Sequence, residues 1–226
     1  CIWCAIYLLR PNWYVYNKSN ILNVLYWVKY FEMVADVQGS IVECGVGRGR
    51  SLVTLLALQD YFDEFLKRDI YALDSFEGFP EPDLEDESPR KPQKGEWSKS
   101  PNKQFSYSIN NLKKILQKAD ISQEKCTIIK GFFDKSTKDL NVKKIAILHL
   151  DGDLYNSVKQ PLTNLASKVS INGIIVIDDF IENDTNQEKE MFPGARKAVE
   201  EFLVENNNYI LKTSIRGTPY LVRLSW

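Results

Sequence analysis

The sequence predicts an α/β fold with a mostly parallel sheet and helices on both faces. From residue 41 onward, short apolar runs typical of strands alternate with longer runs whose apolar residues recur at helical spacing. Some strand-like runs, such as Ile174-Ile-Val-Ile177, are apolar at every position, which is typical of strands buried on both faces. The last two runs flank a turn at Arg216-Gly-Thr218, and this hairpin predicts one antiparallel strand in the sheet.

The individual elements follow from local patterns. Residues 1–40 are rich in aromatic side chains and predict a helical N-terminal cover on one single domain, 1–226. Ser157 with Gln160 has the spacing of a capping box and predicts the start of a helix that Asn172-Gly173 ends. Strands are predicted at 41–45, 69–74, 126–133, 145–150, 174–177, 209–215 and 219–224, and helices at 51–66, 109–119, 157–169 and 195–203.

A long polar segment, residues 80–105, interrupts this alternation. Five prolines make it unsuitable for a helix, and it is too long for a simple connection. Trp97 and Phe105 are large aromatic side chains that a purely solvated loop would expose to water. We therefore expect the segment to form a lid over a binding site.

The overall composition excludes some classes of partner. The 226 residues contain 29 Lys and Arg and 30 Asp and Glu, for a net charge of −1. This balance provides no basic surface for nucleic acid or an anionic membrane, and no apolar run approaches the roughly 18 residues of a membrane span. We therefore expect a cytoplasmic protein. The chain begins at Cys1 rather than a methionine, which leaves open a fragment, a processed form or a trimmed chain.

The four cysteines do not predict a zinc site. Cys1 and Cys4 have a suitable spacing, but the chain has no second pair and one histidine. Cys44 and Cys126 lie in apolar strands and are expected to be core residues in a reducing compartment.

Two pairs of carboxylates follow two apolar strands. Asp151 and Asp153 end the run Leu-His-Leu-Asp-Gly-Asp, and Asp178 and Asp179 end Ile-Ile-Val-Ile-Asp-Asp. Parallel strands bring such residues to the edge of the sheet where ligands bind. Acids after a strand can simply cap the next helix, but two pairs on neighbouring strands favour a site for a hard cation such as Mg²⁺.

A glycine-rich turn, Glu43-Cys-Gly45-Val-Gly47-Arg-Gly49, lies between the first strand and its helix. Glycines allow the backbone to approach a ligand closely. Arg50 stands where the dinucleotide-binding fingerprint needs a glycine, and the turn lacks the lysine of a P-loop. An acid at the end of the next strand, Asp74, gives the turn the pattern of the nucleoside-binding motif of class I methyltransferases.

Six segments together resemble the macrocin O-methyltransferase family, whose members methylate sugar hydroxyls of macrolide and aminocoumarin antibiotics with the help of a metal. The resemblance implies a Rossmann-like class I methyltransferase fold, with a mostly parallel seven-stranded sheet and one antiparallel strand. The segments are Val42-Glu-Cys-Gly-Val, Asp74-Ser-Phe-Glu-Gly-Phe-Pro-Glu-Pro-Asp83, Gly131-Phe-Phe, Leu150-Asp-Gly-Asp-Leu-Tyr155, Val176-Ile-Asp-Asp-Phe180 and Gly194-Ala-Arg-Lys-Ala-Val199.

The resemblance also implies roles for individual residues. Asp151, Asp178 and Asp179 would bind Mg²⁺, and Asp153 would be the general base. The acceptor would be a small-molecule hydroxyl, on a sugar or a phenol and in a vicinal diol. S-adenosylmethionine would be held by Glu43, Gly45, Val46, Gly47, Ser51, Asp74, Ser75 and Phe132. Apart from the resemblance, the aromatic N-terminal region would expose much apolar surface in a monomer, which favours a homodimer.

Three residues depart from the family pattern: Gly47 replaces a bulky aromatic, Arg50 a small residue and His149 an arginine. His149 is expected to be a core histidine without a catalytic role. Three alternatives stay open at this point. They are a methyltransferase-like domain that binds the cofactor without transfer, a nicotinamide-dependent oxidoreductase and a metal-dependent hydrolase.

Overall fold

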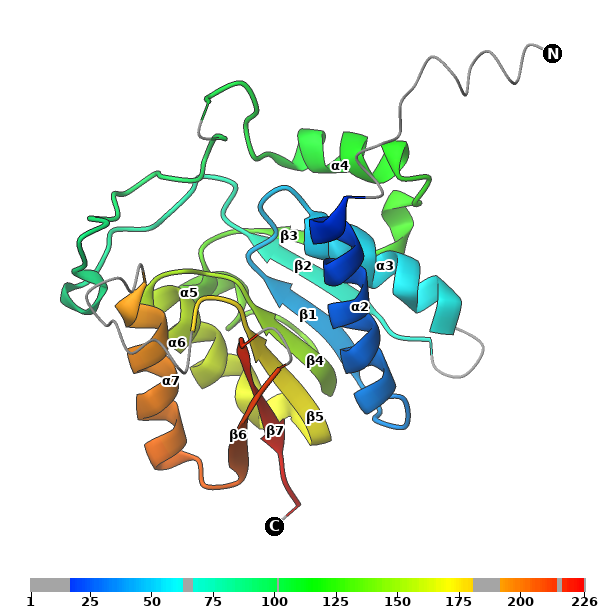
Figure 1. The fold of residues 1–226 in the computed structure, drawn as a ribbon, viewed down its shortest axis with the longest axis vertical. Helices are drawn as coiled ribbons and strands as arrows, with labels where there is room; N and C mark the ends of the chain where they lie inside the picture. The colour runs from blue at the N-terminus through cyan, green and yellow to red at the C-terminus, as the bar shows by residue number, and fades with distance from the viewer. Residues whose placement is uncertain (1–16, 63–66, 101, 181–191, 215–216, 226) are drawn as a thin grey trace.

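The computed structural model describes residues 17–62, 67–100, 102–180, 192–214 and 217–225. They form one seven-stranded sheet with the strand order β3-β2-β1-β4-β5-β7-β6 (Figure 1). Neighbours from β3 to β5 pair in parallel, and β7 pairs antiparallel with both β5 and β6. The predicted sheet, with its one antiparallel strand, is confirmed. The strands are β1 (Ser40–Cys44), β2 (Ile70–Asp74), β3 (Thr127–Lys130), β4 (Ile145–Leu150), β5 (Val169–Ile177), β6 (Tyr209–Thr213) and β7 (Pro219–Arg223).

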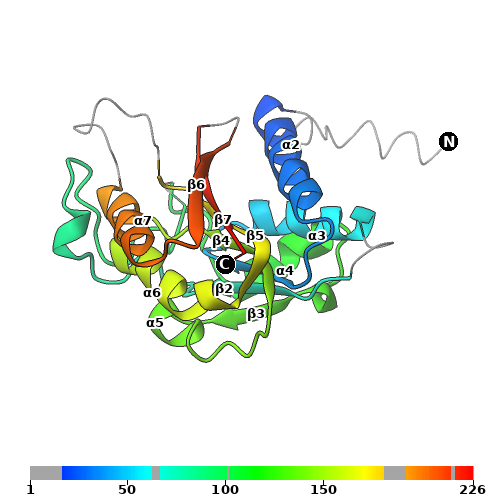
Figure 2. The ribbon, with the colours of Figure 1, turned by 90° about the horizontal axis from the view of Figure 1, so that it is seen from below.

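Helices cover both faces of the sheet, with α2, α3 and α4 on one face and α5, α6 and α7 on the other (Figure 2). Side chains alternate between the two faces of a strand, so Ile147 packs in the core beneath α2 and α3, whereas Leu148 packs in the core beneath α6 and α7. The helices are α2 (Lys18–Met33), α3 (Arg50–Phe62), α4 (Ile109–Lys118), α5 (Phe133–Ser136), α6 (Tyr155–Leu165) and α7 (Pro193–Glu205), with short 3₁₀ helices η2 (Leu84–Asp86), η3 (Gln123–Lys125) and η4 (Ala166–Lys168).

Helix α2 packs against α3, where the rings of Phe31 and Phe62 stack with 5.5 Å between their centroids. Asn17 caps its N-terminus by accepting a hydrogen bond from the Asn20 amide at 2.9 Å. Trp27 and Tyr30 are almost completely buried, and their rings meet edge to face. The first part of the predicted N-terminal cover, including the pair Cys1 and Cys4, lies outside the described residues. No helix in the described part of the chain is both long and apolar enough to cross a membrane.

The predicted boundaries of α6 are wrong at both ends. The helix begins at Tyr155, and Ser157 is a buried residue of its first turn rather than its cap. The Tyr155 amide instead donates to the carboxylate of Asp86, which lies 69 positions earlier in the chain. A cap from a distant loop cannot be recognised by local spacing.

The predicted end of α6 at Asn172-Gly173 is also wrong, because both residues lie within β5. The helix ends at Leu165, and Val169 already pairs with Ile145 of β4. The register between these strands then shifts, and Asn172 adopts a positive φ of 63°. Asn-Gly suits an irregularity in a strand as well as a helix end, because both residue types tolerate positive φ.

Candidate functional site

A cavity of about 640 Å³ opens at the edge of the sheet where the parallel strands end. Ten of the twelve predicted site residues line it, whereas Glu43 and Asp179 are absent from its lining. The ten are Gly45, Val46, Gly47, Ser51, Asp74, Ser75, Phe132, Asp151, Asp153 and Asp178.

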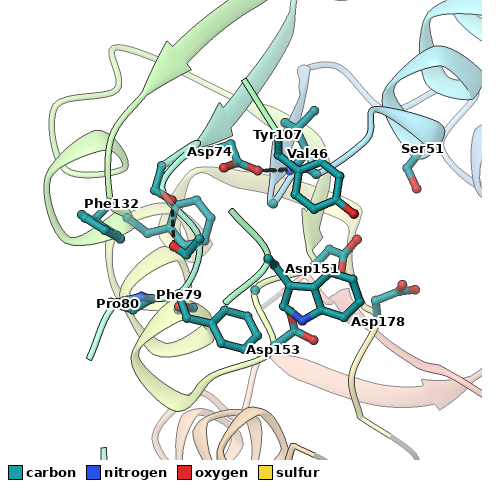
Figure 3. Close-up of a pocket in the computed structure, with 18 of the residues that line it drawn as sticks. Val46, Ser51, Asp74, Phe79, Pro80, Tyr107, Phe132, Asp151, Asp153 and Asp178 are labelled. Atoms are coloured by element: carbon teal, nitrogen blue, oxygen red, sulfur yellow. Dashed lines mark hydrogen bonds between the residues drawn. The ribbon is translucent and has the colours of Figure 1, made fainter. Parts of the chain in front are cut away.

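Asp74 fixes the glycine turn on one side of the cavity. Its Oδ2 accepts hydrogen bonds from the amide of Val46 at 2.9 Å (Figure 3) and from the amide of Gly47 at 2.9 Å. Its Oδ1 accepts one from the Phe76 amide at 2.6 Å. Asp74 therefore holds the glycine turn in place through its carboxylate. A carboxylate has about four acceptor positions, so one position on Oδ1 is left for a hydroxyl in the cavity.

Two glycines of the turn serve different purposes. Gly45 has a φ of 100°, and a Cβ there would lie 1.8 Å from the Asp151 carbonyl oxygen. Only glycine allows the ends of β1 and β4 to approach this closely. Gly47 has a φ of 51°, but a Cβ there would meet no atom of the described residues within 4 Å. The space beside Gly47 is thus open to a ligand.

Arg50, the other departure in this region, links α3 to α2. Its guanidinium donates to the backbone carbonyl of Ser19 at 2.5 Å and to the Ser19 hydroxyl at 3.0 Å. Arg50 also lines the cavity, together with Asn23, Tyr26 and Trp27 of α2. The sequence did not predict that α2 forms part of the site, although Asn23 on a buried helix face is an unusual residue that could have indicated it.

Asp151, Asp153 and Asp178 gather on a different side of the cavity from Asp74 (Figure 3). Burial raises the pKa of Asp151 well above the usual range, and the negative charge of Asp178 raises it further. Burial also raises the pKa of Asp179, with a further contribution from Asp153. Asp151, Asp153 and Asp179 are partly buried and Asp178 is exposed. Carboxylates this close to one another favour a proton or a cation that compensates their charge, and their oxygen atoms suit a divalent cation.

Asp153 is positioned by its backbone. It has a left-handed φ of 60°, and its amide donates to the Asp179 carboxylate at 3.1 Å. Burial raises the pKa of Asp153 to about 6, against the opposing effects of Asp179 and Arg90. The alternative role, a cap for α6, belongs to Asp86 instead. The Asp153 side chain is left to face the cavity.

His149 and Glu43 form a pair in the sheet next to the carboxylates. Both side chains are 1% exposed, and His149 Nδ1 lies 3.2 Å from Glu43 Oε1. Burial raises the pKa of Glu43, and the hydrogen bond with His149 opposes this shift. Glu43 therefore contributes to the site through its contact with His149 and does not line the cavity itself. The ligand atoms of His149, Asp151 and Asp178 lie within 4.8 Å of one another, a grouping that sequence reasoning missed.

The long loop forms a wall of the cavity and is tied to α6. Asp86 accepts hydrogen bonds from the amides of Tyr155 at 2.7 Å and Asp83 at 2.9 Å, and Asp83 accepts one from Asn156 at 2.6 Å. A Cβ on Gly194 of α7 would lie 2.0 Å from Asp86 Oδ1, so a glycine is needed there for α7 to pack against this joint. The loop residues Phe79, Pro80, Glu81, Asp83, Trp97 and Tyr107 line the cavity.

Comparison with known proteins shows the family. The family model for macrocin-O-methyltransferase (TylF) matches residues 28–208. The demethyldecarbamoylnovobiocin O-methyltransferase of Streptomyces niveus is 28% identical over 167 residues, which are 74% of this chain and 59% of that protein. The 8-demethyl-8-(2,3-dimethoxy-alpha-L-rhamnosyl)-tetracenomycin-C 4'-O-methyltransferase of Streptomyces olivaceus is 26% identical over 66% of this chain and 56% of that protein.

The fold agrees with this match. The structure of the O-methyltransferase NovP superposes with a TM-score of 0.71 and 25% identity, over 89% of this chain and 79% of NovP. The matched segments span less than two thirds of the length of the two Streptomyces enzymes. On the family match and on the shared fold, the chain belongs to the macrocin-O-methyltransferase family.

Proposed function

We propose that this chain is an S-adenosylmethionine-dependent O-methyltransferase that uses a divalent cation and acts on a hydroxyl of a sugar or a related small molecule. The observation that carries the proposal is that one cavity joins the glycine turn and Asp74 to the carboxylates Asp151, Asp153 and Asp178. A nucleoside site and a cation site in one cavity are what the transfer of a methyl group to a coordinated hydroxyl requires.

The cofactor would bind along the glycine turn. The open space beside Gly47 leaves room for it, and the remaining acceptor position of Asp74 can take a ribose hydroxyl. Ser51, Ser75 and Phe132 line the same cavity and complete the proposed contacts. Glu43 would not touch the cofactor, because its buried side chain does not line the cavity. Its packing and its charge would instead affect the glycine turn that follows it.

The chemistry is divided between the ligands and the chain. Bound S-adenosylmethionine supplies the methyl group, and a bound divalent cation lowers the proton affinity of a coordinated hydroxyl. Asp151 and Asp178 would hold the cation, for which the sequence predicts Mg²⁺ with Asp179 as a third ligand. Asp153 would accept the hydroxyl proton, because a carboxylate with a pKa of about 6 is ionised at neutral pH and is more basic than an exposed aspartate.

The acceptor would be a small molecule that lies against the loop. Phe79, Trp97 and Tyr107 offer aromatic surfaces at the cavity wall, and an aromatic face packs well against a sugar or phenol ring. Two relatives named above carry novobiocin and rhamnosyl-tetracenomycin in their names, which supports an acceptor on a natural product. A cytoplasmic location and a homodimer stay predictions.

The test of this proposal is calorimetry of the purified chain with S-adenosylmethionine and with NAD, each with and without Mg²⁺. We expect saturable binding of S-adenosylmethionine and none of NAD, followed by methyl transfer to rhamnosyl or catechol acceptors. Asp151→Ala should abolish transfer but keep cofactor binding. Binding of NAD alone would favour an oxidoreductase, and cofactor binding without transfer to any diol would favour a methyltransferase-like binding domain.

A further inference from the structure

We propose that His149 is a direct ligand of the cation, which it binds through Nε2 together with Asp151 and Asp178. The site then has one nitrogen donor beside its carboxylates and prefers Mn²⁺ to Mg²⁺. This inference rests on the proposed function, because it concerns the cation of the same cavity. It also extends the predicted ligand set, because it adds His149 to the carboxylates that the sequence predicts as ligands.

The strand register places the three ligands on one face of the sheet. His149 in β4 lies opposite Glu43 in β1 and Val176 in β5. Residues two apart on a strand share a face, so Asp151 follows His149 and Asp178 follows Val176 on this same face. The resulting approach of the His149, Asp151 and Asp178 ligand atoms, within 4.8 Å of one another, is close enough for one ion to bind all three after small side-chain rotations.

The hydrogen bonding of His149 leaves one ring nitrogen free for a metal. Nδ1 faces Glu43 Oε1 at 3.2 Å, whereas Nε2 is buried and has no hydrogen-bond partner among the residues that the structure describes. A ring that donates Nδ1–H to a carboxylate presents the lone pair of Nε2, and this carboxylate–histidine arrangement is the usual support of a metal-bound histidine. A histidine that served only the core would account for the contact with Glu43 but would leave Nε2 buried and unsatisfied.

The environment also keeps the ring in place. Trp27 meets the His149 ring edge to face, with 4.8 Å between the ring centroids. Glu43 on β1 and Trp27 on α2 therefore hold the imidazole from two directions. We assign Glu43 as a positioning residue that orients His149.

Asp179 has a different contact. Its Oδ2 accepts a hydrogen bond from the amide of Asp153 at 3.1 Å, and neither Asp179 nor His149 is among the residues that line the cavity. Asp179 therefore orients the proposed base. Replacing an oxygen ligand by imidazole shifts the preference of a site from Mg²⁺ toward first-row transition ions, because imidazole binds these ions better than it binds Mg²⁺.

The experiment measures metal binding directly. Untagged, metal-free protein is titrated with Mn²⁺ while electron paramagnetic resonance records the free ion, and Mg²⁺ is then added as a competitor. We expect Mn²⁺ to bind at least about tenfold more tightly than Mg²⁺. The chain contains one histidine, so imidazole ¹⁴N coupling in the pulsed spectrum of bound Mn²⁺ can arise only from His149.

Variants separate ligand loss from misfolding. His149→Asn should remove the ¹⁴N coupling and weaken Mn²⁺ binding at least about tenfold, with a smaller effect on Mg²⁺. Glu43→Gln is the matched control, because it keeps the imidazole and its ¹⁴N coupling but orients the ring less well and so weakens Mn²⁺ binding. Circular dichroism confirms that each variant is folded.

The outcomes distinguish the two proposals. Mn²⁺ that requires Asp151 but shows no imidazole coupling would overturn the role of His149 and leave the methyltransferase proposal standing. Retained Mn²⁺ affinity in folded His149→Asn would overturn it in the same way. Binding of no divalent ion, with normal S-adenosylmethionine binding, would refute both His149 as a ligand and the cation-dependent part of the proposed function.

Discussion

The contact between Gly45 and Asp151 allows a quantitative test of how the two halves of the site are joined. In Gly45→Ala, the new Cβ would lie 1.8 Å from the Asp151 carbonyl oxygen and 2.6 Å from its carbon. Backbone atoms cannot rotate away, so the ends of β1 and β4 must separate. Gly47→Ala is the matched control, because its φ of 51° is also unfavourable to alanine but its Cβ meets no atom of the described residues within 4 Å.

The positive φ costs about 1–2 kcal/mol in both variants. The overlap in Gly45→Ala adds about 1–3 kcal/mol, as overpacking of a tight contact does. For a chain of this length, 1 kcal/mol lowers the Tm by about 2–4 °C, so Gly45→Ala should melt about 2–12 °C below Gly47→Ala. Differential scanning calorimetry measures the difference. Equal melting temperatures, or a lower one for Gly47→Ala, would refute the close approach of the two strand ends.

Three further predictions concern individual carboxylates. Asp74→Asn should weaken S-adenosylmethionine binding about 10–100-fold but leave Mn²⁺ affinity unchanged in calorimetry; the reverse pattern would disprove its place in the cofactor site. Asp86→Asn loses one of two buried acceptors, so the free energy of unfolding should fall by about 1–3 kcal/mol; an unchanged urea midpoint would contradict the joint with Tyr155. Because the pKa of Asp153 rises to about 6 on folding, metal-free protein should lose stability between about pH 4 and pH 6 as the pH rises. Asp153→Asn should reduce that loss, by on the order of 2 kcal/mol, in thermal melts with chelator, and the same pH slope in both proteins would contradict the shift.

Proton binding to Asp153 determines the direction in which stability changes with pH. The folded state binds the Asp153 proton more tightly than the unfolded state does, so protonation favours folding. The stabilisation is present below the unfolded pKa of about 4 and is lost as the pH rises through about 6. A cation held by Asp151 and Asp178 would lower the pKa of Asp153 through its positive charge and should reduce this pH dependence.

The sequence was sufficient for the sheet and for bringing ten of the twelve predicted site residues to one cavity, because both depend on periodic patterns. Apolar runs locate the parallel strands, and ligand residues collect where such strands end. The start of α6 was missed because its cap, Asp86, comes from a loop that is distant in sequence. The end of the same helix was missed because Asn172-Gly173 suits a strand irregularity as well as a helix end.

The site residues that sequence reasoning placed differently depend on the register between strands. The apolar pattern of β4 alone predicts that His149 is a core residue. Its approach to Asp178 becomes apparent only when the pairing of β4 with β5 is known. Glu43 was expected at the cofactor because it precedes the glycine turn, but it points into the sheet toward His149. Period-2 alternation gives the face of each residue, whereas its neighbours on that face require the three-dimensional register.

The joint between the long loop and α6 has a consequence for how tightly an acceptor can bind. A wall that folds only around its ligand uses part of the interaction free energy to order the chain. Here Asp83 and Asp86 already hold the loop to α6, and Arg90 lies over the rings of Phe79 and Phe192. Much of that conformational entropy is lost during folding, before any acceptor arrives. The contacts made by an incoming ring therefore contribute more fully to affinity, and the fixed shape of the wall selects among acceptors.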